Sequence, residues 1–405
     1  RRSKGGVQYG VGFACCMESF GTSSDAAFAG VELSRDGALS VCSSSVDMGQ
    51  GAETALSVAT VRSLGQAATG VVLGDMTLFE GLGISPSPPS TEPGHTPKWA
   101  SSVSASMTAF FHVHAVEQAC HVLYRHGLLP AARDLWGTEL PGDVHWEGGL
   151  LVAKGKKPLS LKALATRAHR ARHVVGARVH TFFQNRFATA SYPDLPGSEV
   201  LPIDALAVAR GTGGKGQAPV YAPETRTAVA YPGPEVARYR RTLYASIGHL
   251  LAVEVYRSGR VQVVDAVTVL DAGDVHHQES LEGQAEGGLA MGLGMALMEE
   301  LPPAPASVDG SLNLNRYFVP RVTHVPPRRH LKLRRVELEP GQSILGEDEV
   351  TPREPRRKKG IAEAAMTTVA PAVGNAIAHA TGLRLRRLPF NQESVRQALD
   401  SRKGP

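Results

Sequence analysis

Cysteine is scarce in this chain, and its spacing limits the chemistry that the thiols can support. The four cysteines among 405 residues are Cys15, Cys16, Cys42 and Cys120. None shows the Cys-x-x-Cys spacing typical of zinc or iron–sulfur ligands, so we expect any iron–sulfur cluster to lie on another chain. Buried thiols in a reducing compartment are expected instead, which predicts a cytoplasmic protein.

Long hydrophobic runs and a signal sequence are also missing. No stretch of about 18 or more uncharged apolar residues occurs, so we expect no membrane-spanning helix. The first residues, Arg1 to Gly6, are polar and do not form a secretory signal pattern. With 42% hydrophobic residues, the chain is nevertheless long enough for a large core or for two lobes.

The net charge of +5 is concentrated in three basic clusters. These clusters cover residues 167–178, 328–335 and 356–359. No zinc-finger, RNP-type aromatic or helix-turn-helix pattern accompanies them. A solvated face or an acidic protein partner therefore explains the clusters better than a nucleic-acid site. The nucleic-acid hypothesis is supported by net charge alone.

Two β-hairpins of similar design are predicted. Strands at 31–33 and 39–41 flank the turn Asp36-Gly37, and strands at 253–256 and 261–269 flank Ser258-Gly259. Both hairpins alternate apolar and polar residues, with glycine supplying the positive φ that a short turn needs. We therefore predict an α+β fold of two related α/β lobes, residues 1–215 and 216–405.

Helical periodicity predicts helices at 53–64, 104–126, 162–172, 281–301, 371–380 and 392–399. Several histidines fall in the second of these, including His112, His114, His121 and His126. A His-x-His pair does not place two ligands on one side of a helix, so no metal site is expected there. The pair His276-His277 is interpreted as structural.

Near the C-terminus, Gly360 and Glu363 form a Gly-x-x-Glu motif ahead of an apolar segment. A carboxylate in apolar surroundings resists ionisation, which suits a base that abstracts a proton. An acidic residue at the start of a helix, interacting with the helix dipole, is the more ordinary interpretation of an isolated motif.

Two glycine-rich segments accompany this motif. Residues 46–54 link a predicted strand to a predicted helix through Gly49, Gln50 and Gly51, a geometry that points backbone N–H groups at an anion. Residues 281–297 carry five glycines in a helical pattern around Gln284. Each such glycine costs about 1 kcal/mol against alanine, so either close helix packing or a closely bound ligand is expected.

In this order, the segments resemble the molybdenum-binding subunit of the xanthine dehydrogenase/aldehyde oxidoreductase family, specifically its C-terminal molybdopterin domain. The colinear stretches that carry the resemblance are 10–65, 100–104, 251–300, 312–326 and 359–399. The family commonly has Gly-x-Gly-Glu, whereas Ala362 precedes the glutamate here, and residues 347–358 are longer and more charged than usual.

The resemblance implies roles for individual residues. Glu363 corresponds to the catalytic glutamate, and Gly360 to the glycine of its motif. Gly49, Gln50 and Gly51 correspond to the turn that hydrogen-bonds the pterin and dithiolene. Gln284 corresponds to a glutamine that contacts the pterin. The residues that correspond to the polar run supporting the pterin phosphate are Ser101, Ser102 and Ser104.

The resemblance also implies partners and cofactors. In the family this domain follows another molybdopterin domain with a glycine- and phenylalanine-rich loop, which has no counterpart in this sequence. A second molybdopterin-binding chain is therefore expected to supply that half. A molybdenum–molybdopterin cofactor, as mononucleotide or cytosine dinucleotide, is expected between the two chains. An iron–sulfur subunit and an FAD subunit are expected to complete the complex.

The activity that the resemblance implies is hydroxylation of an electron-poor carbon with oxygen from water, with Glu363 as general base. N-heteroaromatics such as purine or nicotinate are the expected substrates, and aldehydes are the alternative. A scaffold subunit that keeps the fold without catalysis is a competing interpretation, which the presence of Gln50, Gln284 and Glu363 disfavours.

Overall fold

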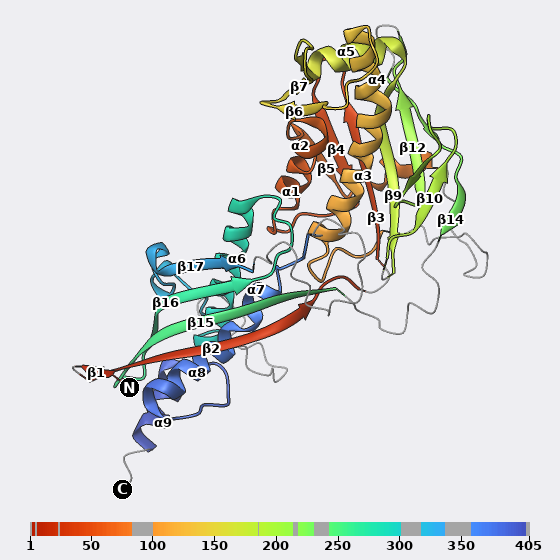
Figure 1. Ribbon diagram of the computed structural model, residues 1–405. Coiled ribbons are helices and arrows are strands. Elements are labelled where there is room, and N and C mark those ends of the chain that lie inside the picture. The colour runs from red at the N-terminus through yellow and green to blue at the C-terminus, as the bar shows by residue number, and fades with distance from the viewer. Residues whose placement is uncertain are drawn as a thin grey trace, which may run out of the picture. The chain divides into compact units, whose positions relative to one another are not determined.

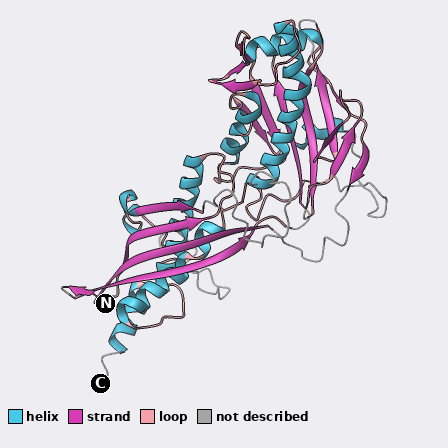
Figure 2. Ribbon diagram, viewed as in Figure 1, coloured by secondary structure: helices cyan, strands magenta, loops and turns pink. Residues whose placement is uncertain are grey.

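A computed structural model describes residues 2–4, 6–22, 25–82, 100–184, 186–213, 218–230, 243–300, 317–336 and 358–401. The chain divides into two compact units (Figure 1). The split unit combines Arg1–Phe20 with Tyr244–Pro405, and the inserted unit is Gly21–Leu243. Both contain helices and strands, which confirms the predicted α+β class (Figure 2).

The division differs from the expected boundary between residues 215 and 216. Strand β2 (Val7–Ser19) pairs antiparallel with β15 (Tyr244–Tyr256) along its whole length, from Val7 opposite Tyr256 to Ser19 opposite Tyr244. The beginning of the chain therefore belongs with its end. The predicted place of residues 1–20 is wrong, because local sequence patterns show that a segment is a strand but not which distant strand it joins.

The split unit is built on one five-stranded sheet with the order β1-β2-β15-β16-β17. Its other strands are β1 (Arg2–Lys4), β16 (Val261–Leu270) and β17 (Leu331–Arg335). The α-helices are α6 (Gln278–Leu297), α7 (Ala364–Thr367), α8 (Val369–Thr381) and α9 (Gln392–Ser401), with 3-10 turns η6 (Val322–His324) and η7 (Arg328–His330). Helix α8 packs on β2 and β15.

Small residues let α8 approach the sheet. A Cβ atom added to Gly10 would lie 2.2 Å from the carbonyl oxygen of Ala376, and one added to Gly12 would lie 2.2 Å from that of Ala372. Only glycine fits at these two positions. The core that results is formed by apolar residues of the sheet, α6 and α8, among them Leu251, Val253, Leu293, Val373 and Ile377.

The inserted unit contains a six-stranded sheet with the order β13-β12-β9-β3-β4-β5. These strands are β3 (Asp25–Leu33), β4 (Leu39–Ser43), β5 (Gly70–Leu73), β9 (Val174–Phe183), β12 (Ala205–Arg210) and β13 (Tyr221–Pro223). Two smaller sheets contain β6 (His145–Glu147), β7 (Leu150–Val152) and β8 (Leu159–Ser160), and β10 (Thr189–Tyr192), β11 (Glu199–Leu201) and β14 (Thr227–Ala230).

Helices of the inserted unit follow the predicted positions with local differences. The helices are α1 (Ala52–Val58), α2 (Val61–Leu64), η1 (Met76–Leu82), η2 (Thr108–His112), α3 (Val113–Leu123), η3 (Tyr124–Leu128), α4 (Leu129–Trp136) and α5 (Leu161–Ala171). The helix predicted from Ser104 begins at Thr108, because Ala105 and Ser106 have φ values of 51° and 54°. Left-handed residues of this kind cannot continue a right-handed helix.

Both predicted hairpins are confirmed. Strands β3 and β4 pair around Gly37, whose φ is 93°, and β15 pairs with β16 around Gly259, whose φ is 85°. The structural interpretation of His277 is confirmed too, since its Nδ1 accepts a hydrogen bond from the backbone N–H of Ser280 and caps α6. Within the described residues, no helix is long and apolar enough to span a membrane.

Candidate functional site

The predicted turn before α1 is stabilised by a carboxylate from the chain itself. Gly49 and Gly51 have φ values of 100° and 77°. The Asp47 carboxylate accepts hydrogen bonds from the backbone N–H groups of Gly49 (2.9 Å) and Glu53 (3.0 Å). The bond from Glu53 is the main cause that lowers the pKa of Asp47. The anion that this turn was predicted to attract is therefore already supplied by Asp47.

Gln50 uses its side-chain amide within the same turn. Its Nε2 donates to the carbonyl oxygen of Val46 (2.7 Å), and its Oε1 accepts from the backbone N–H of Met48 (2.7 Å). A primary amide offers two donors and two acceptor lone pairs, so one N–H and one lone pair remain for a ligand. The two internal bonds fix the direction in which Gln50 presents them.

A buried histidine to which the sequence pattern assigned no role supports the start of this turn. The Nδ1 of His112 lies 3.0 Å from the hydroxyl oxygen of Ser43, which also accepts from the backbone N–H of Ser45 (3.1 Å). His112 is fully buried, and its Nε2 has no hydrogen-bond partner among the described residues. Burial lowers the pKa of His112 to about 4.

We expect this histidine to make the inserted unit sensitive to acid. The unfolded chain takes up the proton near the ordinary pKa of 6.5, whereas folded His112 does so only near 4, so stability falls as pH decreases through this interval. The slope is about 1.4 kcal/mol per pH unit. Urea unfolding, followed by tryptophan fluorescence from pH 7.5 to 4, should show a shallower pH dependence in His112→Gln. His145→Gln, at an exposed histidine, is the control. A pH dependence of stability in His112→Gln that equals that of the unchanged protein would contradict the assignment to His112.

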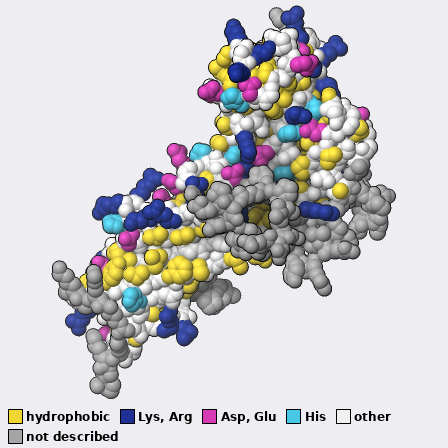
Figure 3. All heavy atoms as spheres, viewed as in Figure 1, with side chains coloured by type: hydrophobic (Ala, Val, Ile, Leu, Met, Phe, Trp, Pro, Cys, Tyr) yellow, Lys and Arg dark blue, Asp and Glu magenta, His cyan; other side chains and the backbone are white. Residues whose placement is uncertain are grey.

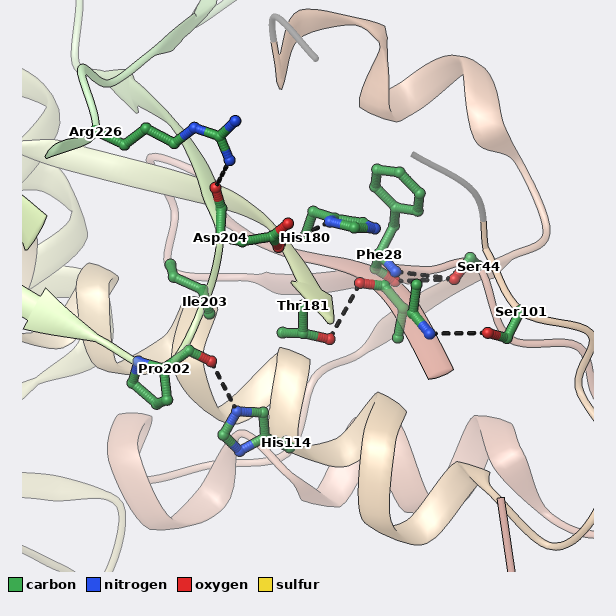
Figure 4. A network of polar contacts seen from close by, with 12 residues as sticks. Phe28, Ser44, Ser101, His114, His180, Thr181, Pro202, Ile203, Asp204 and Arg226 are labelled. Carbon is green, nitrogen blue, oxygen red and sulfur yellow. Dashed lines mark hydrogen bonds and ion pairs between the residues drawn. The ribbon is translucent and has the colours of Figure 1, made fainter. Parts of the chain in front are cut away.

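The serine run, which consists of Ser101, Ser102 and Ser104, lies beside the first residues of β3. The hydroxyl oxygen of Ser101 accepts from the backbone N–H of Ala26 (2.8 Å), and that of Ser44 accepts from the backbone N–H of Phe28 (3.0 Å) (Figure 4). Ser102 and Ser104 are exposed. The structure therefore brings the serine run and the end of β4 together on β3, with the Ser101 hydroxyl engaged and the other two facing solvent.

The glycines of α6 in the split unit serve two purposes. A Cβ atom added to Gly288 would lie 2.4 Å from the Cβ of Ala365, and one added to Gly292 would lie 2.5 Å from the Cβ of Val369. By contrast, a Cβ added to Gly283 or Gly287 would meet nothing within 4 Å. The first pair permits close packing of α6 against α7 and α8, whereas the second pair leaves open surface around Gln284.

This contrast predicts opposite effects for two alanine substitutions on one helix. Gly288→Ala should destabilise the split unit by about 1–3 kcal/mol through overpacking. Gly283→Ala should stabilise α6 by about 1 kcal/mol through helix propensity, yet weaken the retention of any ligand that lies against this surface. Circular dichroism melting measures the change in stability of each variant. Pterin content after gel filtration measures ligand retention by Gly283→Ala. Equal melting temperatures for the two variants would contradict the packing argument.

The segment before Glu363 is fixed to the loop that follows β16. The backbone N–H of Lys359 donates to the carbonyl oxygen of Ala272 (3.0 Å), and its Nζ lies 2.6 Å from Oδ2 of Asp271. Gly360 is buried. Glu363 itself is exposed immediately before α7. The expectation that Glu363 lies in apolar surroundings is therefore wrong for this chain's own structure, since Ala364 and Ala365 occupy the buried side of the turn instead.

Two contacts with the sheet hold α7 and the start of α8 in place. The sulfur of Cys16 lies 3.1 Å from the hydroxyl of Thr367, and the Nδ1 of His249 lies 2.6 Å from the hydroxyl of Thr368. His249 is fully buried, and burial lowers its pKa to about 4. Cys15, next to Cys16, is exposed, which corrects the expectation that the thiols are buried.

Within each unit, the segments that carry the predicted residues contact one another or a common strand. In the split unit, Gln284 lies one helical turn before Gly288, which contacts Ala365 two residues after Glu363. In the inserted unit, Ser44, which precedes the turn around Gln50, and Ser101 of the serine run both accept hydrogen bonds from backbone N–H groups of β3. Two stretches that the sequence pattern singled out, 312–315 and 347–357, lie outside the described residues.

The residues predicted in each unit are chemically suited to a neutral, hydrogen-bonding ligand. The amides of Gln50 and Gln284 and the exposed hydroxyls of Ser102 and Ser104 are uncharged donors and acceptors. Open backbone at Gly49, Gly51, Gly283 and Gly287 permits close approach of a flat ring. Among the described residues, no group of three metal-ligating side chains is found. Within each unit taken by itself, these are donors and acceptors of the kind that a pterin ring can bind.

A family model described as molybdopterin cofactor-binding domain matches residues 1–199 and 215–326. The chain belongs to this family. It is 31% identical over 147 residues to a probable xanthine dehydrogenase subunit of Bacillus subtilis, a match that spans 36% of this chain and 18% of that protein. It is 30% identical over 162 residues to the aldehyde oxidoreductase molybdenum-binding subunit of Escherichia coli K12, spanning 39% and 20%.

Solved structures show the same fold over the whole chain. Quinoline 2-oxidoreductase from Pseudomonas putida 86 superposes with a TM-score of 0.61 at 20% identity, covering 98% of this chain and 42% of that one. The chain therefore corresponds to less than half of the solved relative, and the matches span about a fifth of the two relatives named above. It is similar to part of the molybdenum-binding subunit of such enzymes.

Proposed function

We propose that this chain forms one side of the molybdenum–molybdopterin site of a hydroxylase, with Glu363 as its general base. The observation that carries the proposal is the packing of α6 on α7 in a chain of the molybdopterin cofactor-binding family, since this packing keeps Gln284 and Glu363 in one unit. The proposed reaction is oxidative hydroxylation of an electron-poor carbon with oxygen from water.

The proposed contacts with the cofactor lie within each unit separately. Gln284 and the open surface of Gly283 and Gly287 would contact the pterin from the split unit, with Gly360 shaping the turn before Glu363. From the inserted unit, the contacts would come from Gly49, Gln50, Gly51, Ser101, Ser102 and Ser104. When bound, the cofactor supplies the two-electron redox chemistry that no side chain of this protein can provide.

Glu363 would act by positioning a carboxylate where a proton is released. The Lys359–Asp271 contact and the Cys16–Thr367 contact fix the backbone on either side of it. Its exposure in this chain means that exclusion of water must come from the cofactor, the substrate or a partner. A base positioned in this way contributes typically about 10²–10⁴-fold to a rate.

The proposed partners are a second molybdopterin-binding chain, an iron–sulfur subunit and an FAD subunit, in the cytoplasm. A multi-subunit assembly is proposed because a similar protein of E. coli is a molybdenum-binding subunit of an aldehyde oxidoreductase. N-heteroaromatics such as purine or nicotinate are the first proposed substrates, because the quinoline enzyme shares the fold. Aldehydes are the second, because the molybdenum-binding subunit of an E. coli aldehyde oxidoreductase is similar in sequence.

Metal and pterin analysis of the purified complex tests the proposal. We expect about one molybdenum and one pterin per copy of this chain, together with hydroxylation of an N-heteroaromatic or an aldehyde. A stable complex that contains neither molybdenum nor pterin would instead favour a scaffold subunit.

A further inference from the structure

Glu363 and Thr368 stand at the two ends of one very short helix. Glu363 is the residue immediately before α7, and Thr368 is the residue immediately after it. With 4 residues, α7 is about 6 Å long. A single helical turn is not stable by itself, because nucleating it costs more than its few hydrogen bonds return. The direction of α7, and of the residue that precedes it, must therefore be set by tertiary contacts.

His249 of β15 makes such a contact at the end of α7. Its Nδ1 lies 2.6 Å from the hydroxyl oxygen of Thr368, and the two residues expose only 0% and 2% of their surface. The Nε2 of His249 has no hydrogen-bond partner among the described residues. Within that part of the chain, Thr368 is therefore the side chain to which the imidazole is bound.

An imidazole is unusual at this position of the sheet. The other inward positions of β15 around it are buried and apolar, namely Ile247, Leu251, Val253 and Val255. Hydrophobic side chains also gather on the surface over this sheet (Figure 3). Burying a polar group costs free energy unless it is hydrogen-bonded, so an apolar side chain would suit this core better. What the histidine adds is a directional bond, which specifies one arrangement of Thr368.

Backbone hydrogen bonds connect Thr368 to Glu363. The N–H of Thr368 donates to the carbonyl oxygen of Met366, and the N–H of Met366 donates to the carbonyl oxygen of Glu363 (3.2 Å). Thr368 also begins α8, since its carbonyl oxygen accepts from the N–H of Ala372 (3.1 Å). A displacement of Thr368 is therefore passed along α7 to the backbone of Glu363.

We propose that His249 is a positioning residue for Glu363, which fixes the direction of the carboxylate by holding Thr368 at the other end of α7. The proposal rests on the proposed function, in which Glu363 is the general base. Burial lowers the pKa of His249 to about 4, so at neutral pH the imidazole is uncharged and acts through geometry. The contact of Cys16 with Thr367 (3.1 Å) remains when His249 is altered, so α7 should tilt rather than detach.

Thr368→Val tests the inference, because valine keeps the shape of threonine and removes the hydroxyl. In the assembled complex, the turnover number should fall about tenfold to a hundredfold with KM nearly unchanged, as expected for a displaced catalytic group. Thr368→Ser keeps the hydroxyl and should retain most of the rate. Molybdenum content should be the same in both variants.

Thr381→Val is the matched control. Thr381 is buried at the far end of α8, and its hydroxyl donates to the carbonyl oxygen of Ile377 (2.8 Å). The same substitution therefore removes a buried threonine hydroxyl from the same helix without touching α7. It should leave turnover within about twofold.

Substitutions of His249 provide a second pair. His249→Asn places an amide near the position of Nδ1 and should keep most of the rate, whereas His249→Leu should lose as much as Thr368→Val. Combining His249→Leu with Thr368→Val should cause no further loss, because both changes remove the same bond. Thr368→Val decides the matter if His249→Leu does not fold.

Amide hydrogen exchange of residues 364–368 measures the position of α7 without reference to cofactor or turnover. Exchange should be about fivefold faster in Thr368→Val and unchanged in Thr381→Val. Unchanged exchange in Thr368→Val would overturn the inference, even with reduced turnover, because the loss would not then pass through α7.

The kinetics of Glu363→Gln separate this inference from the proposed function. Normal turnover in Thr368→Val, in a complex that Glu363→Gln inactivates, would overturn the inference and leave the proposed function standing. Normal turnover in Glu363→Gln would overturn both, even if exchange in Thr368→Val were faster, since α7 would then not carry the base.

Discussion

Glu363→Gln is expected to lower the turnover number of the assembled complex by about 10²–10⁴-fold, because glutamine keeps the shape of the side chain but cannot accept the proton. We expect no large effect on folding to accompany this loss, since Glu363 is exposed before α7. Steady-state kinetics with an N-heteroaromatic and with an aldehyde measure the rate, and metal analysis verifies that the cofactor is still bound.

Glu279→Gln is the matched control for this variant. Glu279 is an exposed glutamate of the same unit, in the first turn of α6, and the proposed chemistry does not use it. Its substitution should leave turnover within about twofold. If Glu363→Gln keeps a rate close to that of Glu279→Gln, Glu363 is not the base.

Gly12→Ala is expected to lower the free energy of unfolding of the split unit by about 3 kcal/mol, the upper part of the usual range for overpacking. The added Cβ would lie 2.2 Å from both the carbonyl oxygen of Ala372 and the backbone nitrogen of Ala376. Backbone atoms of a helix cannot turn aside as a side chain can. The whole of α8 must therefore move away from β2.

The three tryptophans make this prediction specific to one unit. Trp136 and Trp146 lie in described parts of the inserted unit, and Trp99, which is outside the described residues, falls within the bounds of that unit. Fluorescence is therefore expected to follow this unit, whereas circular dichroism reports both units. Gly12→Ala should shift the circular dichroism transition and leave the fluorescence transition in place. Gly142→Ala, where an added Cβ meets nothing within 4 Å, should change neither. A shift of both transitions by Gly12→Ala would mean that the two units unfold together.

Local features of the fold could be predicted because they depend on neighbouring residues. The turn at Asp36-Gly37 and the end of α8 at Gly382, whose φ is 80°, both follow from the conformational freedom of glycine. The pairing of β2 with β15 could not be predicted, because the alternation of side chains in these strands is like that of many other strands and does not specify a partner.

For the candidate site, the roles of the named residues stay predictions, and the directions of their side chains could not be predicted. Gln284 lies on α6, and Glu363 lies immediately before α7, which packs against α6; this arrangement is compatible with the common role proposed for them. The occupation of the turn by Asp47, and the exposure of Glu363, depend on side-chain directions that a motif does not contain. His112 and His249 gave no signal, since a lone histidine in an apolar segment has the same pattern whether it is buried or not.

The division of the split unit between the two ends of the chain has a consequence for synthesis. Strand β2 leaves the ribosome before the inserted unit, whereas β15 and α8 follow only after the whole inserted unit has been made. Until then, the apolar residues of β2 have no native neighbour, and nascent-chain aggregation or chaperone capture at this segment is expected. The inserted unit should therefore mature before the split unit, and the turn that carries Glu363 should reach its final position only after the inserted unit has folded.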